Sequence, residues 1–593
     1  MWLGFFIGSV CCLILPLAWV KIAATKNGKK CKIFNALFTF TILSVFVAFL
    51  PVYAVNLTLS VTGIARIFLM SVFKTIQVFT AGCEFDVISK VIADCPPWLR
   101  SLYQAWCAFL FALSPLLTFG FVLSLFKNAI SHIRFRLSFF KDMYVFSELN
   151  EKSFALAKDI KQNHTDVAVV FADVYYKGEE KMYELIDRAK GIGAITFQKD
   201  ILLLNFNSHS AKKNIFLFAI GENETENLNQ ALNIIENYKT RKNTHLYVFS
   251  TKIESELLLS TADKGFIKVR RINEVQSLVS RILFEKGNLL FESAKKLEDG
   301  IKNISVIVAG MGSHGTEFIK ALTWFGQMDG YRIKINAFDK DELAEEKFSA
   351  LAPELMHSDY NGVIIEGEAQ YSIKIHSGVD VYSKTFIDEV NKIDDATFVI
   401  IALGNDDVNI STAVTLRTCF ERKSINPVIQ AIVYNSQQKK ALTGIKNYRN
   451  QEYCIDFIGD IESSYTENVI LNSELENLAL ERHLKWGEED EFWTYEYNYR
   501  SSVASAIHLR ARIACEIPGA SKSEAELTIE ERDAIEALEH RRWNAYMRAE
   551  GYVYSGSKEK ESRNDLGKMH NDLIDYSSLS DDEKRKDSKI GTT

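Results

Sequence analysis

The chain has 593 residues, more than the roughly 250–300 that a single hydrophobic core usually serves, so we expect several domains. It carries 69 Lys and Arg against 76 Asp and Glu, a formal net charge of −7 at pH 7. The whole-chain charge therefore does not favour a nucleic-acid-binding protein. Its nine cysteines form neither a CxxC pair nor a Cys/His cluster, which argues against a structural zinc site.

Apolar residues are concentrated before residue 127. Segments 2–20, 33–57 and 102–126 each approach the ~20 residues that a helix needs to cross a membrane. The first segment has neither a basic start nor a small-residue cleavage site, so we interpret it as a membrane helix rather than a signal peptide. Residues 1–127 are therefore predicted to form an α-helical transmembrane region.

The charge of the loop between the first two segments predicts the topology. It contains lysines and no acid, which places it in the cytoplasm by the positive-inside rule: Lys21, Lys26, Lys29, Lys30 and Lys32. The N-terminus and residues 58–100 are then expected outside, and everything after the third segment in the cytoplasm. This predicts a multi-pass protein of the inner (plasma) membrane.

Residues 61–82 are too apolar for a solvated loop, yet Arg66 and Lys74 interrupt them. Two interpretations remain open. One is a re-entrant pore segment over residues 61–86, because irregular backbone at membrane depth must line a cavity or be buried in protein. The other is an amphipathic helix that lies on the outer leaflet or packs against its neighbours.

The end of this segment, QVFTAGCEFD, resembles in outline a pore helix that leads into a potassium-channel filter. In the pore interpretation, Thr80, Ala81 and Gly82 line the pore. The second glycine and the tyrosine of that filter are absent, so potassium selectivity does not follow. Three helices do not easily enclose a pore, so a channel requires a homo-oligomer with cyclic symmetry, and a tetramer is favoured.

From residue 141 onward, short apolar segments alternate with amphipathic ones, which predicts α/β units with parallel sheets. Residues 141–290 contain the predicted strands MYVFSE, VAVVFADV, NIFLFAI, THLYVFS and FIKVRRI. The pattern restarts at Ile304 with SVIVAG, RIKINAFD, TFVIIALG and PVIQAIVY. We therefore predict two Rossmann-like domains, over residues 141–290 and 300–485.

The second of these domains carries a dinucleotide-binding fingerprint. Gly310, Gly312 and Gly315 form GxGxxG directly after a strand, and Asp339 ends the next strand. The glycines let the backbone approach a pyrophosphate at a helix N-terminus, and the acid can bond a ribose hydroxyl. These four residues are the predicted cofactor site. The cofactor stays unknown, with NAD or another adenine nucleotide as candidates, and an empty site is the alternative.

The equivalent turn of the first domain reads FSELNEKS and has no glycine. Ser147, Leu149 and Lys152 stand there instead. Their side chains would block the close approach of a phosphate, so we expect the first domain to be degenerate and to serve structure or assembly.

Residues 141–470 resemble the TrkA-N, or RCK, regulatory units of potassium transport. GVDVYSKTFIDEV and FVIIALGNDDVNISTAVTLR are similar to the later strands and helices of such units. The resemblance implies a gating ring beneath a pore that responds to nucleotides or ions. The glycine fingerprint and Asp339 carry over, whereas the first domain departs from the pattern.

Residues 493–593 resemble the RyR domain, first described as a repeat in ryanodine receptors. Three runs agree in order: EHRRW, GYVYSG and HNDLIDYSSLSDDEKRKD. The turn has Tyr552 where a tryptophan is common, and Asn571 replaces a proline. The resemblance implies a mainly α-helical domain.

An aromatic ring beside cations in this RyR-like domain suits a nucleotide, because the ring can stack on a base while a cation pairs with phosphate. The predicted ligand-binding residues are Arg500, His540, Arg541, Trp543 and Lys568. The alternative is that Trp543 belongs to the core and that the arginines, including Arg542, form a solvated face.

The three parts together resemble bacterial membrane effectors of nucleotide-signal anti-phage systems. The resemblance implies a ligand-gated channel or pore-forming effector, controlled by a nucleotide or short oligonucleotide from a signal-synthesising nucleotidyltransferase. We predict no catalytic and no metal-binding residues. One alternative is a housekeeping potassium-transport regulator or channel of RCK type. The other is a membrane-anchored NAD-dependent enzyme, for which His314 in the glycine loop would need an orienting partner.

Overall fold

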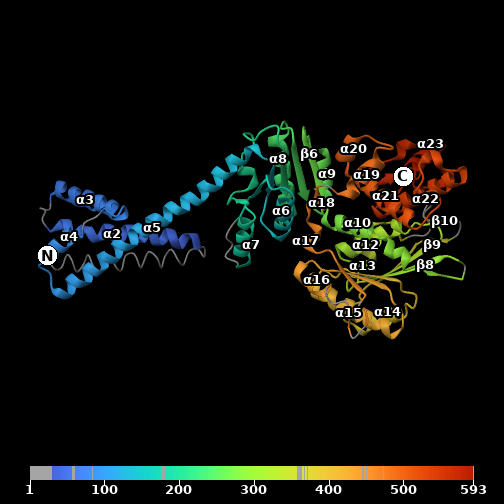
Figure 1. Ribbon diagram of the computed structural model, residues 1–593, viewed down its shortest axis with the longest axis horizontal. Helices are drawn as coiled ribbons and strands as arrows, with labels where there is room; N and C mark the ends of the chain where they lie inside the picture. The colour runs from blue at the N-terminus through green and yellow to red at the C-terminus, as the bar shows by residue number, and fades with distance from the viewer. Residues whose placement is uncertain are drawn as a thin grey trace. The chain divides into compact units, whose positions relative to one another are not determined.

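The computed structural model describes residues 30–55, 60–82, 85–174, 180–298, 300–356, 364–365, 368–369, 371–443, 447–448, 451–452, 454–471 and 473–591. The chain divides into two compact units (Figure 1). The first takes in Met1–Leu137, Tyr175–Arg188 and Ile195–Phe197, and the second takes in Ser138–Val174, Ala189–Ala194 and Gln198–Thr593. The predicted membrane segment 2–20 lies outside the described residues.

The described N-terminal part of the first unit is helical: α2 (Lys30–Ala54), α3 (Val61–Phe79), α4 (Asp86–Val91) and α5 (Pro97–Leu137). Among the described residues, three helices are long and apolar enough to cross a membrane, over Leu37–Ala54, Val61–Phe79 and Pro97–Gly120. The predicted apolar helices at 33–57 and 102–126 are thus confirmed, and the second of them extends beyond its predicted end. Their orientation in a membrane stays a prediction.

Residues 61–79 form one continuous helix, α3, and it packs against α2 and α5. Gly63, Ser71, Thr75 and Val78 are buried on its inner side. Its 19 residues meet the length of a full crossing, an option that the two sequence interpretations left out. The number of membrane crossings before α5 therefore depends on whether α3 itself crosses the membrane.

The predicted pore residues form the C-terminal cap of α3. The backbone N–H of Gly82 donates to the carbonyl oxygen of Gln77 at 2.8 Å, and that of Ala81 donates to Val78 at 3.2 Å. Ala81 has φ +58°, so this is a Schellman motif with alanine in the position that usually takes glycine. Thr80–Gly82 thus close a helix and do not continue as an extended strand of the filter type. Their pore role stays a prediction.

The second unit begins with a parallel sheet. Its strands are β1 (Met143–Phe146), β2 (Ala168–Phe171), β4 (Ile215–Ala219), β5 (Thr244–Phe249) and β6 (Ile267–Ile272), in the order β2-β1-β4-β5-β6. The intervening helices are α6 (Glu151–Asn163), α8 (Glu224–Tyr238), α9 (Ile253–Thr261) and α10 (Glu274–Lys286). All five strands predicted from the sequence are confirmed.

A second parallel sheet follows, in the order β12-β9-β8-β13-β14-β17. Its strands are β8 (Lys302–Ala309), β9 (Tyr331–Phe338), β12 (Tyr371–His376), β13 (Phe398–Ile401), β14 (Val428–Ile432) and β17 (Ile455–Ile458). Its main helices are α12 (Ser313–Phe325), α13 (Ala344–Leu351), α14 (Lys384–Asn391), α15 (Asp406–Arg422) and α16 (Ser436–Thr443). The sequence prediction contained four of these strands. It missed β12 and β17 because these edge strands are only partly buried and lack a continuous apolar run.

Within this unit, helices that follow one sheet along the chain pack on helices of the other sheet. Helix α10 follows the first sheet and packs on α12 of the second. In return, α17 (Ile461–Ser464) and α18 (Glu467–Ile470) follow the second sheet and pack on α6 of the first. There the carboxylate of Asp159 accepts the backbone N–H of Glu467 at 2.7 Å. The Rossmann-like sheets are therefore interlocked rather than strung in series.

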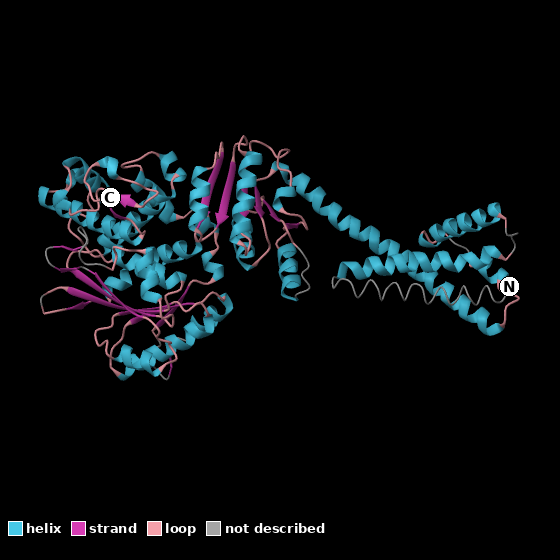
Figure 2. Cartoon of the chain, turned by 180° about the vertical axis from the view of Figure 1, so that it is seen from behind, coloured by secondary structure: helices cyan, strands magenta, loops and turns pink. Residues whose placement is uncertain are grey.

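The regular elements of the C-terminal part are mainly helices (Figure 2). Its main helices are α19 (Glu474–His483), α20 (Glu489–Thr494), α21 (Glu496–Ala514), α22 (Ile529–Ala549) and α23 (Asp581–Gly591). An apolar stripe of α22 is buried, formed by Ile535, Leu538, Tyr546 and Ala549, and α22 packs directly on α12. The rings of Trp324 and Tyr546 meet there at 6.2 Å, so the C-terminal helices share one core with the second sheet.

A buried ion pair inside this shared core tests how firmly the C-terminal helices are attached. The side chains of Arg548 and Glu354 pair while only 0% and 4% exposed. We expect Arg548→Ala to lower the free energy of unfolding of the full-length protein by about 3–5 kcal/mol, because it leaves a buried carboxylate unpaired. Thermal unfolding in detergent measures this loss.

The matched control is Arg585→Ala on α23. Arg585 pairs with Asp582 at 3.8 Å with both side chains largely exposed, so we expect a loss below about 1 kcal/mol. Equal losses in the two variants would contradict the shared core.

Candidate functional site

The turn between β8 and α12 has the backbone that a dinucleotide loop requires. Gly310 has φ +94°, and a Cβ there would lie 2.6 Å from the carbonyl oxygen of Ala402. A Cβ on Gly315 would lie 1.8 Å from the carbonyl oxygen of Gly310, so glycine lets α12 pack against the strand end. Gly312 precedes α12 and would have no atom within 4 Å of an added Cβ. Open space therefore lies beside Gly312 at the helix N-terminus.

Asp339 holds this loop in place from the end of β9. One carboxylate oxygen accepts the backbone N–H of Met311 at 2.6 Å, and the other accepts that of Asp341 at 2.8 Å. Each carboxylate oxygen has a second lone pair, so a ribose hydroxyl could still donate to Asp339. The structure thus brings the four predicted cofactor residues together.

A cavity of about 600 Å³ lies at this loop, over the carboxyl ends of β8, β9, β13 and β14. The strand order reverses between β8 and β13, which is where ligands bind in open α/β sheets. Its volume lies within the roughly 300–1,000 Å³ of small-molecule sites. Gly310, Gly312 and Asp339 line it, together with Gly404 and Asn405 at the end of β13.

His314 in the glycine loop has a partner that the sequence did not reveal. Its Nδ1 lies 3.2 Å from the hydroxyl of Tyr434, beyond the end of β14. Burial lowers the pKa of His314 and raises the pKa of Tyr434 to about 12, so the pair is neutral at pH 7. Within the described residues, no three His, Cys, Asp or Glu side chains lie together as a metal site.

The first sheet fills its equivalent position with its own side chains. The hydroxyl of Ser147 accepts the backbone N–H of Ile220 at 2.9 Å, and the amide of Asn150 donates to the Ile220 carbonyl at 2.8 Å. Leu149 is buried, and Lys152 pairs with Glu274 at 2.6 Å. Side chains therefore occupy this turn, and the polar contacts of Ser147 and Asn150 with Ile220 join the end of β1 to the end of β4.

The predicted C-terminal site residues do not lie together. His540 and Trp543 line a cavity of about 390 Å³ between α21, α22 and residues 560–587. Arg541 points elsewhere and pairs with Asp329, while Lys568 donates to the carbonyl oxygen of Glu550 at 2.7 Å. Only two of the five residues therefore share this cavity.

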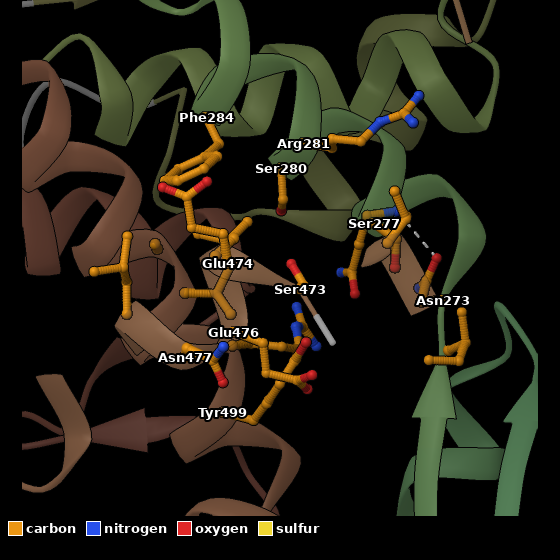
Figure 3. Close-up of a pocket in the computed structure, with 18 of the residues that line it drawn as sticks. Asn273, Ser277, Ser280, Arg281, Phe284, Ser473, Glu474, Glu476, Asn477 and Tyr499 are labelled. Atoms are coloured by element: carbon orange, nitrogen blue, oxygen red, sulfur yellow. Dashed lines mark hydrogen bonds between the residues drawn. The ribbon is translucent and has the colours of Figure 1, made fainter. Parts of the chain in front are cut away.

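Arg500 lines a third cavity, of about 740 Å³, which lies between α10 on one side and α19 and α21 on the other. Figure 3 shows Ser277, Ser280 and Phe284 facing Glu474 and Asn477 across it. Its deepest cations already have acidic partners: Arg270 pairs with Glu476, Arg271 with Glu496, and Arg500 with Glu550. Seven glutamates line this cavity against five arginines, so its net charge is negative and does not favour a multiply charged anion.

The cavity at Trp543 contains residues that the sequence interpretation missed: Arg482, Tyr497, Arg542, Arg563 and His570. Arg482 precedes the predicted domain start at 493, and Arg542 was grouped with a solvated face. That alternative is wrong for Arg542, whose side chain is only 2% exposed. On α22, Arg542 lies three residues after the buried acid Glu539, and this spacing was the available signal.

Comparison with protein-family models gives no match for this chain, and comparison with curated proteins gives none either.

The glycine loop predicts a contrast between two identical substitutions. We expect Gly315→Ala to lower the free energy of unfolding by about 1–3 kcal/mol or more, because its methyl group meets backbone atoms of Gly310. Gly312→Ala should leave stability nearly unchanged, since its φ of −65° suits alanine and its Cβ meets nothing. Thermal unfolding of the two full-length variants measures the difference. Equal stability of the two variants would contradict the prediction, because it would show that α12 does not need glycine at position 315 to approach Gly310.

Proposed function

We propose that this protein is a ligand-gated inner-membrane channel or pore-forming effector. A nucleotide or short oligonucleotide signal is sensed by the α/β sheets and the C-terminal helices, and the response is a change in membrane permeability. The resemblances to TrkA-N/RCK units, to the RyR domain and to anti-phage effectors support this proposal. A nucleotidyltransferase of the same system would supply the signal.

The observation that carries the proposal is the course of α5. This single helix has 41 residues and includes the membrane-length stretch Pro97–Gly120. It continues to Leu137, which adds about 25 Å of helix. Only Ser138–Asp142 then separate it from β1. The helix that would move in gating thus leads along the chain, through residues 138–142, into β1.

The end of α5 is also fixed by packing. Phe135 is buried, and its ring meets that of Phe197 edge-on at 5.5 Å. Phe197 follows β3 (Ile195–Thr196), so the contact joins the helix to a segment far away in sequence. A ligand shifts such an arrangement only by its differential affinity for two states, and the coupling then reaches the membrane through α5.

Assembly into a ring follows from the same proposal. Three or four helices per chain do not enclose a pore, so a cyclic homo-oligomer is required, with a tetramer favoured. The cavity at the glycine loop would then serve as a cofactor site of the sensor, with NAD or another adenine nucleotide as candidates, rather than as a catalytic centre.

A flux assay on the full-length protein in liposomes tests the proposal. We expect NAD⁺, ATP or a short oligoadenylate to change the release of trapped K⁺ or Na⁺. We expect Phe135→Ala to reduce this response about 10-fold while binding of the same nucleotide is retained, because the substitution removes the packing at the end of α5.

Leu137→Ala is the control, because Leu137 lies two residues further on and its side chain is exposed. It should leave the response intact. The proposal fails if the reconstituted protein conducts no ions with or without these nucleotides.

A further inference from the structure

A cluster of buried arginines lies between α19, α21 and α22. Arg482, Arg512 and Arg542 are 6%, 0% and 1% exposed. Arg512 and Arg542 share one carboxylate, that of Glu539, which is 1% exposed and accepts from Arg512 at 3.0 Å and from Arg542 at 2.7 Å. Asp587, the next acid, pairs with His540 at 3.3 Å. Burying more cations than carboxylates is costly unless an anion compensates for them.

Polar atoms of this cluster remain without a hydrogen-bond partner in the described part of the chain. They include Nη1 of Arg542 and the hydroxyl of Ser502, both of which belong to residues that line the 390 Å³ cavity. Nε and Nη1 of Arg512, behind Glu539, are further examples. Buried donors are almost always satisfied, so Nη1 of Arg542 and the Ser502 hydroxyl suit a ligand that accepts hydrogen bonds. Five arginines and lysines line the cavity against four carboxylates, and this excess of positive charge favours an anion.

Flat rings form another wall of the same cavity. The Trp543 ring lies 4.9 Å from that of His570 and 5.7 Å from that of His540. Tyr497 also lines the cavity, and the guanidinium of Arg563 lies over its ring at 5.9 Å. Such walls bind planar rings by stacking. His570 is neutral at pH 7, since burial and the nearby Arg563 lower its pKa to about 4.

We infer that this cavity binds a phosphate-bearing ligand of nucleotide size. Its phosphate lies against Arg542 and Ser502, and its base lies against Trp543. A phosphate monoester carries about 1.5–2 negative charges at pH 7, which offsets the excess of the arginine cluster. The volume of about 390 Å³ suits one nucleotide unit. Arg500, Arg541 and Lys568 do not line this cavity, so they are not ligand-binding residues of this site.

The inference rests on the proposed function, because it assigns the signal of that function to this cavity rather than to the glycine loop. Seating a ligand here acts on α22, which packs on α12, and α12 begins at the glycine loop. The two cavities would therefore be linked through one helix pair.

Calorimetric titration of the full-length protein in detergent tests the inference with two probes, AMP and ribose 5-phosphate. We expect both to bind, with AMP at least 10-fold tighter because only AMP carries a ring for Trp543. Trp543→Ala should remove that preference and leave the affinity for ribose 5-phosphate unchanged. Ser502→Ala should weaken both probes about 5- to 10-fold.

Ser502→Ala also separates binding from folding. Because its hydroxyl has no partner among the described residues, we expect an unchanged or higher melting temperature. Gly312→Ala controls for the other cavity and should leave the effects of these two variants in place. If neither probe binds at millimolar concentration, or if both variants bind as the wild type does, the inference is overturned.

These outcomes are distinct from failure of the proposed function. Probe binding that depends on Ser502 and Trp543, in a protein that conducts no ions, supports the cavity and overturns the channel. A nucleotide-dependent flux that both variants leave unchanged supports the channel and overturns the cavity.

Discussion

Helix α12 is buried on two sides, and the arrangement of the second unit depends on this constraint. One side packs on its own sheet at β8 and β9, and the other packs on α22, α21 and α10. Nine of its thirteen residues are buried, including Lys320, which lies 3.4 Å from both Glu317 and Glu550. A helix that covers a Rossmann-like sheet and faces solvent on its other side would need only one apolar stripe. Helix α12 has apolar residues on its outer side as well, and α22, more than two hundred residues later in the chain, covers them.

This burial joins the elements from which a sensor would be built. The N-terminus of α12 borders the glycine-loop cavity, and its later turns carry Trp324 against Tyr546 of α22. The same α22 carries Arg542 and Trp543 into the C-terminal cavity. Both cavities therefore border one continuous hydrophobic core.

The two Rossmann-like sheets share one architecture and differ at the turn after their first strand. In each, an asparagine braces two strand ends: Asn227 bonds Gly221 and Phe249, and Asn409 bonds Leu403 and Ile432. The turns after the first strands differ, however. Glycines leave open space beside Gly312, whereas Ser147 and Asn150 close the corresponding position of the first sheet. The second sheet thus has a cavity at this turn, whereas side chains occupy the corresponding turn of the first sheet.

The sequence alone determined those features that local chemistry dictates. Apolar runs of sufficient length identified α2 and α5 of the first unit, and apolar runs between amphipathic stretches identified nine parallel strands. The spacing of Gly310, Gly312, Gly315 and Asp339 identified a loop whose residues meet, because a strand–turn–helix brings them together within one short segment. The edge strands β12 and β17 escaped because partial burial removes the apolar run that marks a central strand.

Only the tertiary structure decided the C-terminal site. Arg500, Arg541 and Arg542 look alike in sequence, yet they pair with Glu550, Asp329 and Glu539 in three different surroundings. Arg542 is buried with an unsatisfied donor because helices from distant parts of the chain pack around it. No local sequence pattern indicates which helices will pack together. The same holds for Thr80–Gly82, where a turn sequence reminiscent of a filter closes a helix through backbone bonds to Gln77 and Val78. Side-chain type is a local property, whereas burial and pairing are set by long-range packing.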